Sequence, residues 1–254
     1  MIKVADKIDK IVKRYNEALD SILVKAGKEI QGVVAGLEVK AGKILSTPEN
    51  LKKIETMRAE IMGALDSAGY NQLTKEYIAS YDAVIKDMQE YYNEIGLKKF
   101  VQADIDKIIA LKDISLGQFE GLASNAVQTI RQQVSKVALS GGRFNDAVAN
   151  IAKSLTGEFE AYSRTYAKTA ITDFAATVNK IKSEESGIKK YRYDGHLQDN
   201  SRDCCREWMG NAYTSEEIAG FHAGMFADGS PFIDGDILIV RGGWNCNHYW
   251  APVK

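Results

Sequence analysis

QFEGLASNAVQTIRQQVSKV, residues 118–137, is the most regular stretch of the sequence. Its apolar side chains recur every three to five residues, which places them along one face of an amphipathic helix. This helix is expected to end at the Gly141-Gly142 pair, because glycine commonly terminates helices. The stripe consists of Phe119, Leu122, Val127, Ile130, Val134 and Val137.

Similar stripes cover most of the chain before residue 186, and Pro48 is the only proline in the first 230 residues. Thr47 is expected to cap a helix that has Pro48 at its first position. The N-terminal stripe contains Val4, Ile8, Ile11, Tyr15, Ile22 and Ile30. Further helices are predicted from near Asn71 to Ile95, over residues 144–154, and from a Thr156 cap to Ile181.

The character of the sequence changes near Glu184, where glycine, asparagine and aspartate become frequent. One short β-rich run, Asp236–Arg241, follows. All three cysteines, all three histidines and all three tryptophans lie between His196 and Trp250. The fold class we expect is therefore mainly α: a long helical N-terminal arm or bundle with a small α+β C-terminal module at residues 186–254.

Charge and hydropathy exclude several classes of protein. The 33 basic and 34 acidic side chains are nearly balanced, and residues 193–254 carry five more acidic than basic groups. A duplex-DNA grip by this part of the chain is therefore not expected. The start, MIKVADKIDKIVKRY, mixes charges into every turn, unlike a signal peptide. No apolar run approaches the roughly 20 residues of a membrane helix, so we expect a protein made in the cytoplasm with no membrane partner.

Two blocks characterise the C-terminal module. Residues 195–213 read GHLQDNSRDCCREWMGNAY, and residues 242–253 read GGWNCNHYWAPV. These blocks resemble the C-terminal domain of phage head-morphogenesis proteins, the minor head proteins of Mu-like and related tailed bacteriophages. The positions that match the family's pattern are Asp199, Ser201, Arg202, Cys205, Gly210, Asn245, Cys246, His248 and Pro252.

The resemblance implies a structural minor capsid protein rather than an enzyme. Such a protein lies in the virion, inside the capsid near the portal, in several copies. It assists head assembly and also DNA packaging or ejection. The partners that the resemblance implies are the phage portal protein, the major capsid protein and the packaged DNA.

The resemblance covers about residues 140–254 and departs from the family at one element. The preceding helix of the family carries Ala-Arg-Thr-Glu, whereas this chain has Ala167-Lys168-Thr169-Ala170. We expect three segments: a helical docking arm at 1–110, long helices at 111–185, and the head-morphogenesis module at 186–254. Extended amphipathic helices suit the arm to docking on a protein partner.

Three residues of the two blocks are candidate metal ligands. Cys246 and His248 are two residues apart, so in an extended segment both side chains leave the same face. Cys205 comes from the other block and is expected in the first turn of a short helix. Zinc takes four such ligands in most structural sites. The fourth ligand stays open between His196, His222 and Asp199, because Cys204 adjoins Cys205 on the same helix and points elsewhere.

Other interpretations of these residues stay open. The thiols can be small buried hydrophobes, or Cys205 and His248 can form a catalytic pair oriented by Asp199. Asp199 and Arg202 are expected to form a buried ion pair, with phosphate binding by Arg202 as the alternative. The module's core is expected to consist of Trp208, Trp244 and Trp250, and Thr214 with Glu217 forms a predicted capping box.

Two other functions remain alternatives to the structural one. The first is a Cys/His-dependent or zinc-dependent hydrolase packaged in the virion, which an open cleft at Cys205 and His248 would favour. The second is an internal DNA-binding protein, which a basic stripe along the arm would favour.

Overall fold

The predicted mainly α architecture is confirmed by a computed structural model that describes residues 1–97, 99–221 and 235–253. Among these residues, no helix combines the length and apolar character needed to span a membrane. The helices are α1 (Ile2–Ala35), α2 (Pro48–Ala68), α3 (Tyr70–Ala79), α4 (Tyr81–Glu94), α5 (Gln102–Leu139), α6 (Phe144–Lys153), the π-helix η1 (Ser154–Phe159), α7 (Glu160–Glu185), α8 (Asp203–Trp208), α9 (Ser215–Ala219) and α10 (Ile237–Val240). The strands are β1 (Val39–Lys40), β2 (Lys43–Ile44), β3 (Lys190–Asp194), β4 (Ala212–Thr214) and β5 (Tyr249–Val253).

Two predicted helix starts are confirmed by their hydrogen bonds. The Thr47 hydroxyl accepts from the Asn50 backbone N–H at 3.3 Å, directly before α2. At α9 the predicted capping box is present. The Thr214 hydroxyl accepts from the Glu217 N–H at 3.2 Å, and the Glu217 carboxylate accepts from the Thr214 N–H at 2.7 Å. Both motifs supply acceptors for N–H groups that a helix start leaves unpaired.

Three local predictions are wrong. The helix expected from Asn71 to Ile95 is two helices, α3 and α4, which are divided at Ser80; there the Ala83 N–H bonds the Ser80 carbonyl, three residues back, at 3.1 Å. Thr156 does not cap α7: its hydroxyl donates to the Ala152 carbonyl at 2.9 Å, and η1 joins α6 to α7 without a break. The run Asp236–Arg241 is a single helical turn, α10, because the Asp236 side chain accepts from the Leu238 N–H at 2.8 Å.

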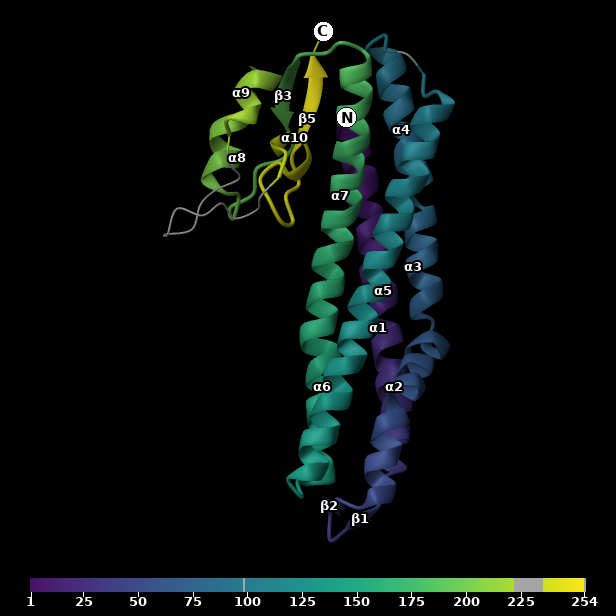
Figure 1. Ribbon diagram of the computed structural model, residues 1–254. Coiled ribbons are helices and arrows are strands. Elements are labelled where there is room, and N and C mark those ends of the chain that lie inside the picture. Colours follow the sequence, from purple (N-terminus) through teal and green to yellow (C-terminus); the bar gives the residue numbers. More distant parts are fainter. Residues whose placement is uncertain (98, 222–234, 254) are drawn as a thin grey trace. The chain divides into compact units, whose positions relative to one another are not determined.

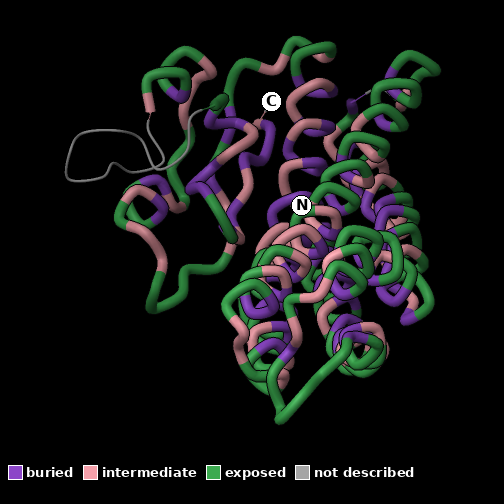
Figure 2. The backbone as a smooth tube through the Cα atoms, turned by 60° about the horizontal axis from the view of Figure 1, so that its bottom comes forward, coloured by how far each residue is buried: buried purple, intermediate pink, exposed green. Residues whose placement is uncertain are grey.

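The chain forms two compact units. Unit 2 comprises residues 13–78 and 115–164, and its core consists of helix faces with buried residues at helical intervals (Figure 2). Tyr15, Tyr77 and Phe119 meet there, with ring centroids 4.7–5.6 Å apart. The predicted stripe on α5 forms part of this core, since Phe119, Val127, Ile130 and Val134 are fully buried.

Unit 1 comprises residues 1–12, 79–114 and 165–254. It contains the C-terminal module, whose strands form a three-stranded antiparallel sheet in the order β4-β3-β5. β3, β5 and the short helices α8 to α10 lie together beside the C-terminal part of α7 (Figure 1). The module's small core contains Tyr191, Tyr193, Cys205, Trp208, Ile218, Ile237, Leu238, Cys246 and Trp250.

β5 is an edge strand that is bonded to helices of the same unit. The Asn179 side-chain amide on α7 donates to the Trp250 carbonyl at 2.8 Å. The Tyr91 hydroxyl on α4 donates to the Pro252 carbonyl at 3.4 Å. Pro252 has no N–H, which is tolerated at the edge of a sheet. The sheet is therefore anchored to both helices through β5, one of its two edge strands.

A buried ion pair joins α5 to α7 within the same unit. Lys182 donates to the Asp104 carboxylate at 3.0 Å and to the Lys99 carbonyl at 2.9 Å. Burial alone would raise the pKa of Asp104, but hydrogen bonds from the Val101 N–H and from Lys182 lower this pKa below its usual value. Asp104 is therefore ionised in the native state at neutral pH.

Candidate metal centre

The two sequence blocks meet at one cluster of metal-binding side chains. Cys205 Sγ, Cys246 Sγ and a ring nitrogen of His248 all lie within 4.8 Å of one another, and all three residues are buried. The distance from Cys246 Sγ to His248 Nδ1 is 3.4 Å. A tetrahedral zinc ion with bonds of about 2.0–2.3 Å needs donor atoms roughly 3.3–3.8 Å apart. The cluster can therefore hold a metal ion with little rearrangement.

Local backbone structure explains how each ligand is presented. Cys205 lies in the first turn of α8, as expected, with Arg202 at the N-cap. Cys246 follows a tight turn in which its N–H bonds the Gly243 carbonyl at 3.1 Å and Asn245 has a φ of +59°. Asparagine tolerates this left-handed conformation better than most residues. His248 then directly precedes β5, so the sheet fixes its position.

Glycine is required where the backbone touches the cluster. A Cβ atom on Gly242 would lie 2.3 Å from Cys205 Sγ and 3.0 Å from Cys246 Sγ. Gly195 has a φ of +140°, and a Cβ there would lie 2.9 Å from His248 Cδ2. The backbone therefore packs directly on both sulfurs and on the imidazole, and a larger residue would displace the ligands.

The electrostatics of the cluster favour a thiolate. A hydrogen bond with Cys205 lowers the pKa of the Cys246 thiol. A hydrogen bond with His248 and the positive charge of Arg241 lower this pKa further. Bonds with Cys204 and Cys246 raise the pKa of Cys205. Tyr193 lies with its hydroxyl 3.4 Å from each sulfur. Burial raises the pKa of Tyr193, so its hydroxyl stays protonated and donates to a sulfur.

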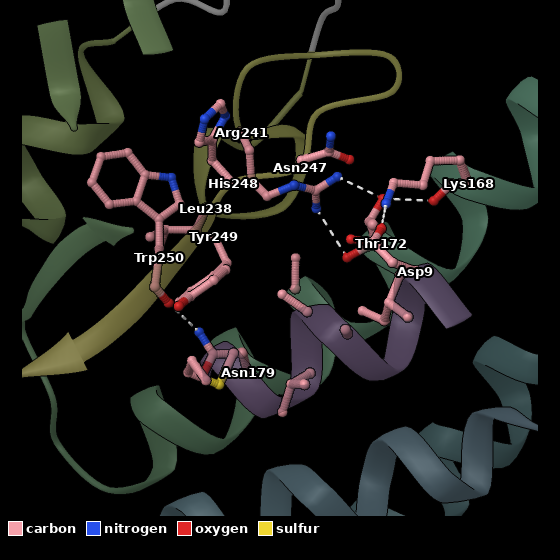
Figure 3. Close-up of a pocket in the computed structure, with 16 residues that line it drawn as sticks. Asp9, Lys168, Thr172, Asn179, Leu238, Arg241, Asn247, His248, Tyr249 and Trp250 are labelled. Atoms are coloured by element: carbon pink, nitrogen blue, oxygen red, sulfur yellow. Dashed lines mark hydrogen bonds and ion pairs between the residues drawn. The ribbon is translucent and has the colours of Figure 1, made fainter. Parts of the chain in front are cut away.

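A buried arginine holds the cysteine loop on α7. Arg241 is 1% exposed and donates to the Thr172 carbonyl at 3.0 Å, to the Thr172 hydroxyl at 3.0 Å and to the Asp173 carboxylate at 2.7 Å. Figure 3 shows Arg241 bonded to Thr172 beside a cavity of about 40 Å³. The φ of Arg241 is +54°, which is unfavourable for a residue with a side chain. These bonds offset that strain and fix the residue next to Gly242.

The cluster borders an open polar cleft of about 460 Å³. Cys205, Cys246 and His248 all line it, whereas Tyr193 does not. Lys168 and Arg202 bring positive charge to it, and the described lining includes no carboxylate. Its other lining residues are His196, Gln198, Asn200, Ser201, Trp244, Asn245 and Asn247.

The remaining motif residues have structural positions around the cluster. Gly210 has a φ of +76°, and its N–H bonds the Tyr193 carbonyl at 2.9 Å. Asn245 donates its backbone N–H to the Thr169 hydroxyl at 3.4 Å. Pro252 lies in β5, opposite Tyr191. Of the Ala167–Ala170 element, Thr169 thus contacts the cysteine loop, while Lys168 forms an ion pair with Asp9.

The expected Asp199–Arg202 ion pair is wrong. Asp199 is exposed, and Arg202 instead donates to the Trp244 carbonyl at 2.9 Å. Arg206 holds the loop that runs from Gly195 to α8. It donates to the carbonyls of Gln198, Asp199 and Ser201 at 2.8–3.1 Å. Backbone carbonyls therefore replace the carboxylate that the sequence suggested.

Two further expectations about the site change. Trp208 and Trp250 are in the module's core, but Trp244 is 50% exposed at the cleft, so the prediction that it belongs to the core is wrong. His196 lines the cleft without joining the three-residue group. Of the other candidate fourth ligands, Asp199 is exposed outside the group and His222 lies outside the described residues. Among the described residues, no fourth Cys, His, Asp or Glu completes the set.

Sequence reasoning missed Tyr193, Arg241 and Gly242 as parts of the site. Tyr191 and Tyr193 alternate in a strand pattern, but nothing in this alternation indicates that one hydroxyl meets two sulfurs. Gly242 belongs to a Gly-Gly pair beside a cysteine block, and that pair was a usable signal of close backbone approach.

Comparison of the chain with protein-family models, with curated proteins and with solved structures gives no match.

Proposed function

We propose that this chain is a minor head protein of a tailed bacteriophage whose C-terminal module is held together by a zinc ion. One observation carries the proposal. The residues on which the resemblance rests come from two blocks separated by residues 214–241, and the structure brings Cys205, Cys246 and His248 together at one centre. The long amphipathic helices supply surface for docking on the portal protein or the major capsid protein, inside the capsid.

Zinc is the metal that best fits these ligands. Two thiolates and one imidazole form a donor set that zinc commonly takes, whereas magnesium and calcium prefer oxygen ligands. The module buries only a small core, and a bound metal ion would offset that deficit. When bound, zinc supplies a cross-link between α8 and the segment before β5.

The metal part of this proposal is tested by elemental analysis. Protein purified without chelator should contain about one equivalent of zinc per chain, since a structural site binds tightly. Cys204→Ser, which changes a thiol outside the group, should retain the metal, and Cys246→Ser should lose it. Protein that contains no metal in either form would contradict the zinc assignment and leave the sulfurs as buried thiols.

The assembly part is tested by co-purification from infected cells. A tagged copy of the chain should co-purify with the portal protein or the major capsid protein and should be found in purified heads. Recovery of heads with normal composition and infectivity from a phage that lacks the gene would contradict an assembly role.

A metal-dependent hydrolase is the second candidate, because the cluster borders an open cleft. Three protein ligands with an open fourth position are the arrangement of catalytic zinc sites. Turnover of p-nitrophenyl esters or phosphates by zinc-loaded protein, absent from metal-free protein, would favour this candidate over a purely structural metal.

A further inference from the structure

The cluster has two differently built sides. Tyr193 meets both sulfurs from within the module's core, with its hydroxyl 3.4 Å from each. All three ligand residues also line the cleft, where Tyr193 is absent. A tetrahedral ion held by three protein ligands has one position left. Because no further Cys, His, Asp or Glu of the described chain joins the group, the cleft is the route by which an outside ligand reaches that position.

The cleft carries the charge and the donors that an oxyanion needs. Arg202 uses one N–H for the Trp244 carbonyl, which leaves donors of its guanidinium for a ligand. Lys168 adds a second cation, partly balanced by its ion pair with Asp9. The described lining contains side-chain amides and a hydroxyl but no carboxylate that would repel an anion. The two bound thiolates would neutralise a zinc ion, so these cations determine the sign of the charge in the cleft.

Two buried polar atoms add a second, independent observation. His248 is 5% exposed and its Nε2 atom has no hydrogen-bond partner among the described residues, and the same holds for Asn247 Oδ1. Both residues line the cleft. A histidine that binds metal through Nδ1 normally donates its other N–H to an acceptor. Buried polar atoms without partners are costly. The His248 N–H points away from a metal on Nδ1, and Asn247 Oδ1 needs a donor, so water ordered in the cleft would satisfy both atoms.

We propose that the cleft binds a phosphate group, with one phosphate oxygen at the fourth position of the metal and Arg202 bonded to the others. This inference rests on the proposed metal centre and deepens it. A volume of about 460 Å³ exceeds what one phosphate fills, so the cleft also accommodates a substituent of a phosphate monoester. Trp244, 50% exposed at the rim, offers that substituent a flat apolar face.

The test uses the full chain loaded with Co²⁺, whose visible absorption reports the ligands of a tetrahedral site. Inorganic phosphate and adenosine monophosphate are titrated separately, with adenosine as the control that lacks a phosphate. Both phosphate compounds should change the cobalt spectrum, and adenosine should not. Tighter binding of adenosine monophosphate, with fluorescence quenching that Trp244→Phe removes, identifies a phosphate monoester as the ligand. Equal binding identifies free phosphate.

Variants separate the cleft from the metal. Arg202→Gln should weaken phosphate binding about tenfold or more, because a charge-assisted hydrogen bond is lost. Arg202→Lys should retain part of the affinity, and Arg14→Gln, at an exposed arginine of unit 2, should leave it unchanged. The anion-free cobalt spectrum should be the same in all variants, which checks that the cluster is intact.

The outcomes distinguish the two proposals. A chain that takes up no cobalt contradicts the metal centre, and the phosphate site is then rejected with it. A chain that binds cobalt with a thiolate spectrum that neither phosphate compound changes contradicts the phosphate site alone. Binding that Arg202→Gln leaves unaltered also overturns the assignment of the cleft.

Discussion

The core of unit 2 and the core of the C-terminal module are built in different ways. In unit 2, stability comes from apolar stripes spread along several helices, so each side chain contributes a small, replaceable part. In the module, two sulfurs, one imidazole, one tyrosine hydroxyl and the backbone of Gly242 share one small volume. Each of these groups has a specific partner. We therefore expect unit 2 to tolerate substitutions that the module does not.

Loss of a proposed metal ligand is the strongest test of this difference. Cys246→Ser should abolish zinc binding and unfold the module, since zinc contributes on the order of 10 kcal/mol to folding in small zinc domains. Near-ultraviolet circular dichroism from the aromatic cluster should collapse, while most far-ultraviolet helicity remains. Cys204→Ser should preserve both signals. Equal loss of helicity throughout the chain would show that the two regions do not differ in this way.

The Asp104–Lys182 pair tests whether specific partners matter among the helices as well. Asp104→Asn leaves the buried Lys182 ammonium with only the more distant Glu185 carboxylate, at 3.8 Å, and should cost about 3 kcal/mol in urea unfolding. Asp106→Asn, at an exposed neighbour on α5, should cost less than about 0.5 kcal/mol. A small effect at Asp104 would mean that even a buried ion pair is replaceable between α5 and α7 within unit 1.

The same pair gives a pH dependence. The folded pKa of Asp104 is lowered, so its contribution to stability is complete above the ordinary aspartate pKa of about 4. The contribution is lost as the pH falls through the folded pKa. The stability difference between wild type and Asp104→Asn should therefore narrow only in acid, below about pH 4. A difference that narrows near pH 6 would identify another titrating group.

Two glycines provide a matched pair across the regions. Gly242→Ala inserts a methyl group 2.3 Å from Cys205 Sγ and should cost about 1–3 kcal/mol and weaken metal binding. Gly63→Ala adds the same group on α2, where nothing lies within 4 Å, and should stabilise the chain by about 0.5–1 kcal/mol. Thermal unfolding with and without zinc measures both. If both alanines were neutral, close packing at the cluster would not be essential.

The smallest effect is expected inside the helical core. Ile130→Val removes one buried methylene and should cost about 0.5–1.5 kcal/mol, without any change in zinc content. The lost stability should appear in the denaturation midpoint. A larger cost, or a change in metal content, would show that the α5 stripe also depends on exact shape.

The sequence predicted the helical part well because one physical rule governs it. The spacing of apolar residues indicates α1, α2, α5 and α7, and Thr47 carries its own capping signal. The rule failed at Ser80 and Thr156. At Thr156 the hydroxyl bonds the Ala152 carbonyl, and at Ser80 the Ala83 N–H bonds a carbonyl three residues back. Periodicity of apolar residues does not detect such local bonds.

The candidate centre was predictable in its ligands but not in their surroundings. Cysteine and histidine are rare and chemically distinctive, so Cys205, Cys246 and His248 were identified without a structure. Arg241 was not, because an arginine is ordinarily exposed and only the fold shows it buried against Thr172. The position of Trp244 was misjudged for the opposite reason, since an aromatic residue in a small domain usually belongs to its core.

The anchored β5 edge of the sheet has a consequence for how copies of the chain can pair with one another. An exposed edge strand is a template for pairing with another chain, and such pairing leads to polymers and aggregates. Here the carbonyls of Trp250 and Pro252 are bonded to Asn179 and Tyr91, and proline offers no donor to an incoming strand. The β5 edge is therefore protected against pairing with a strand of a second copy of the chain.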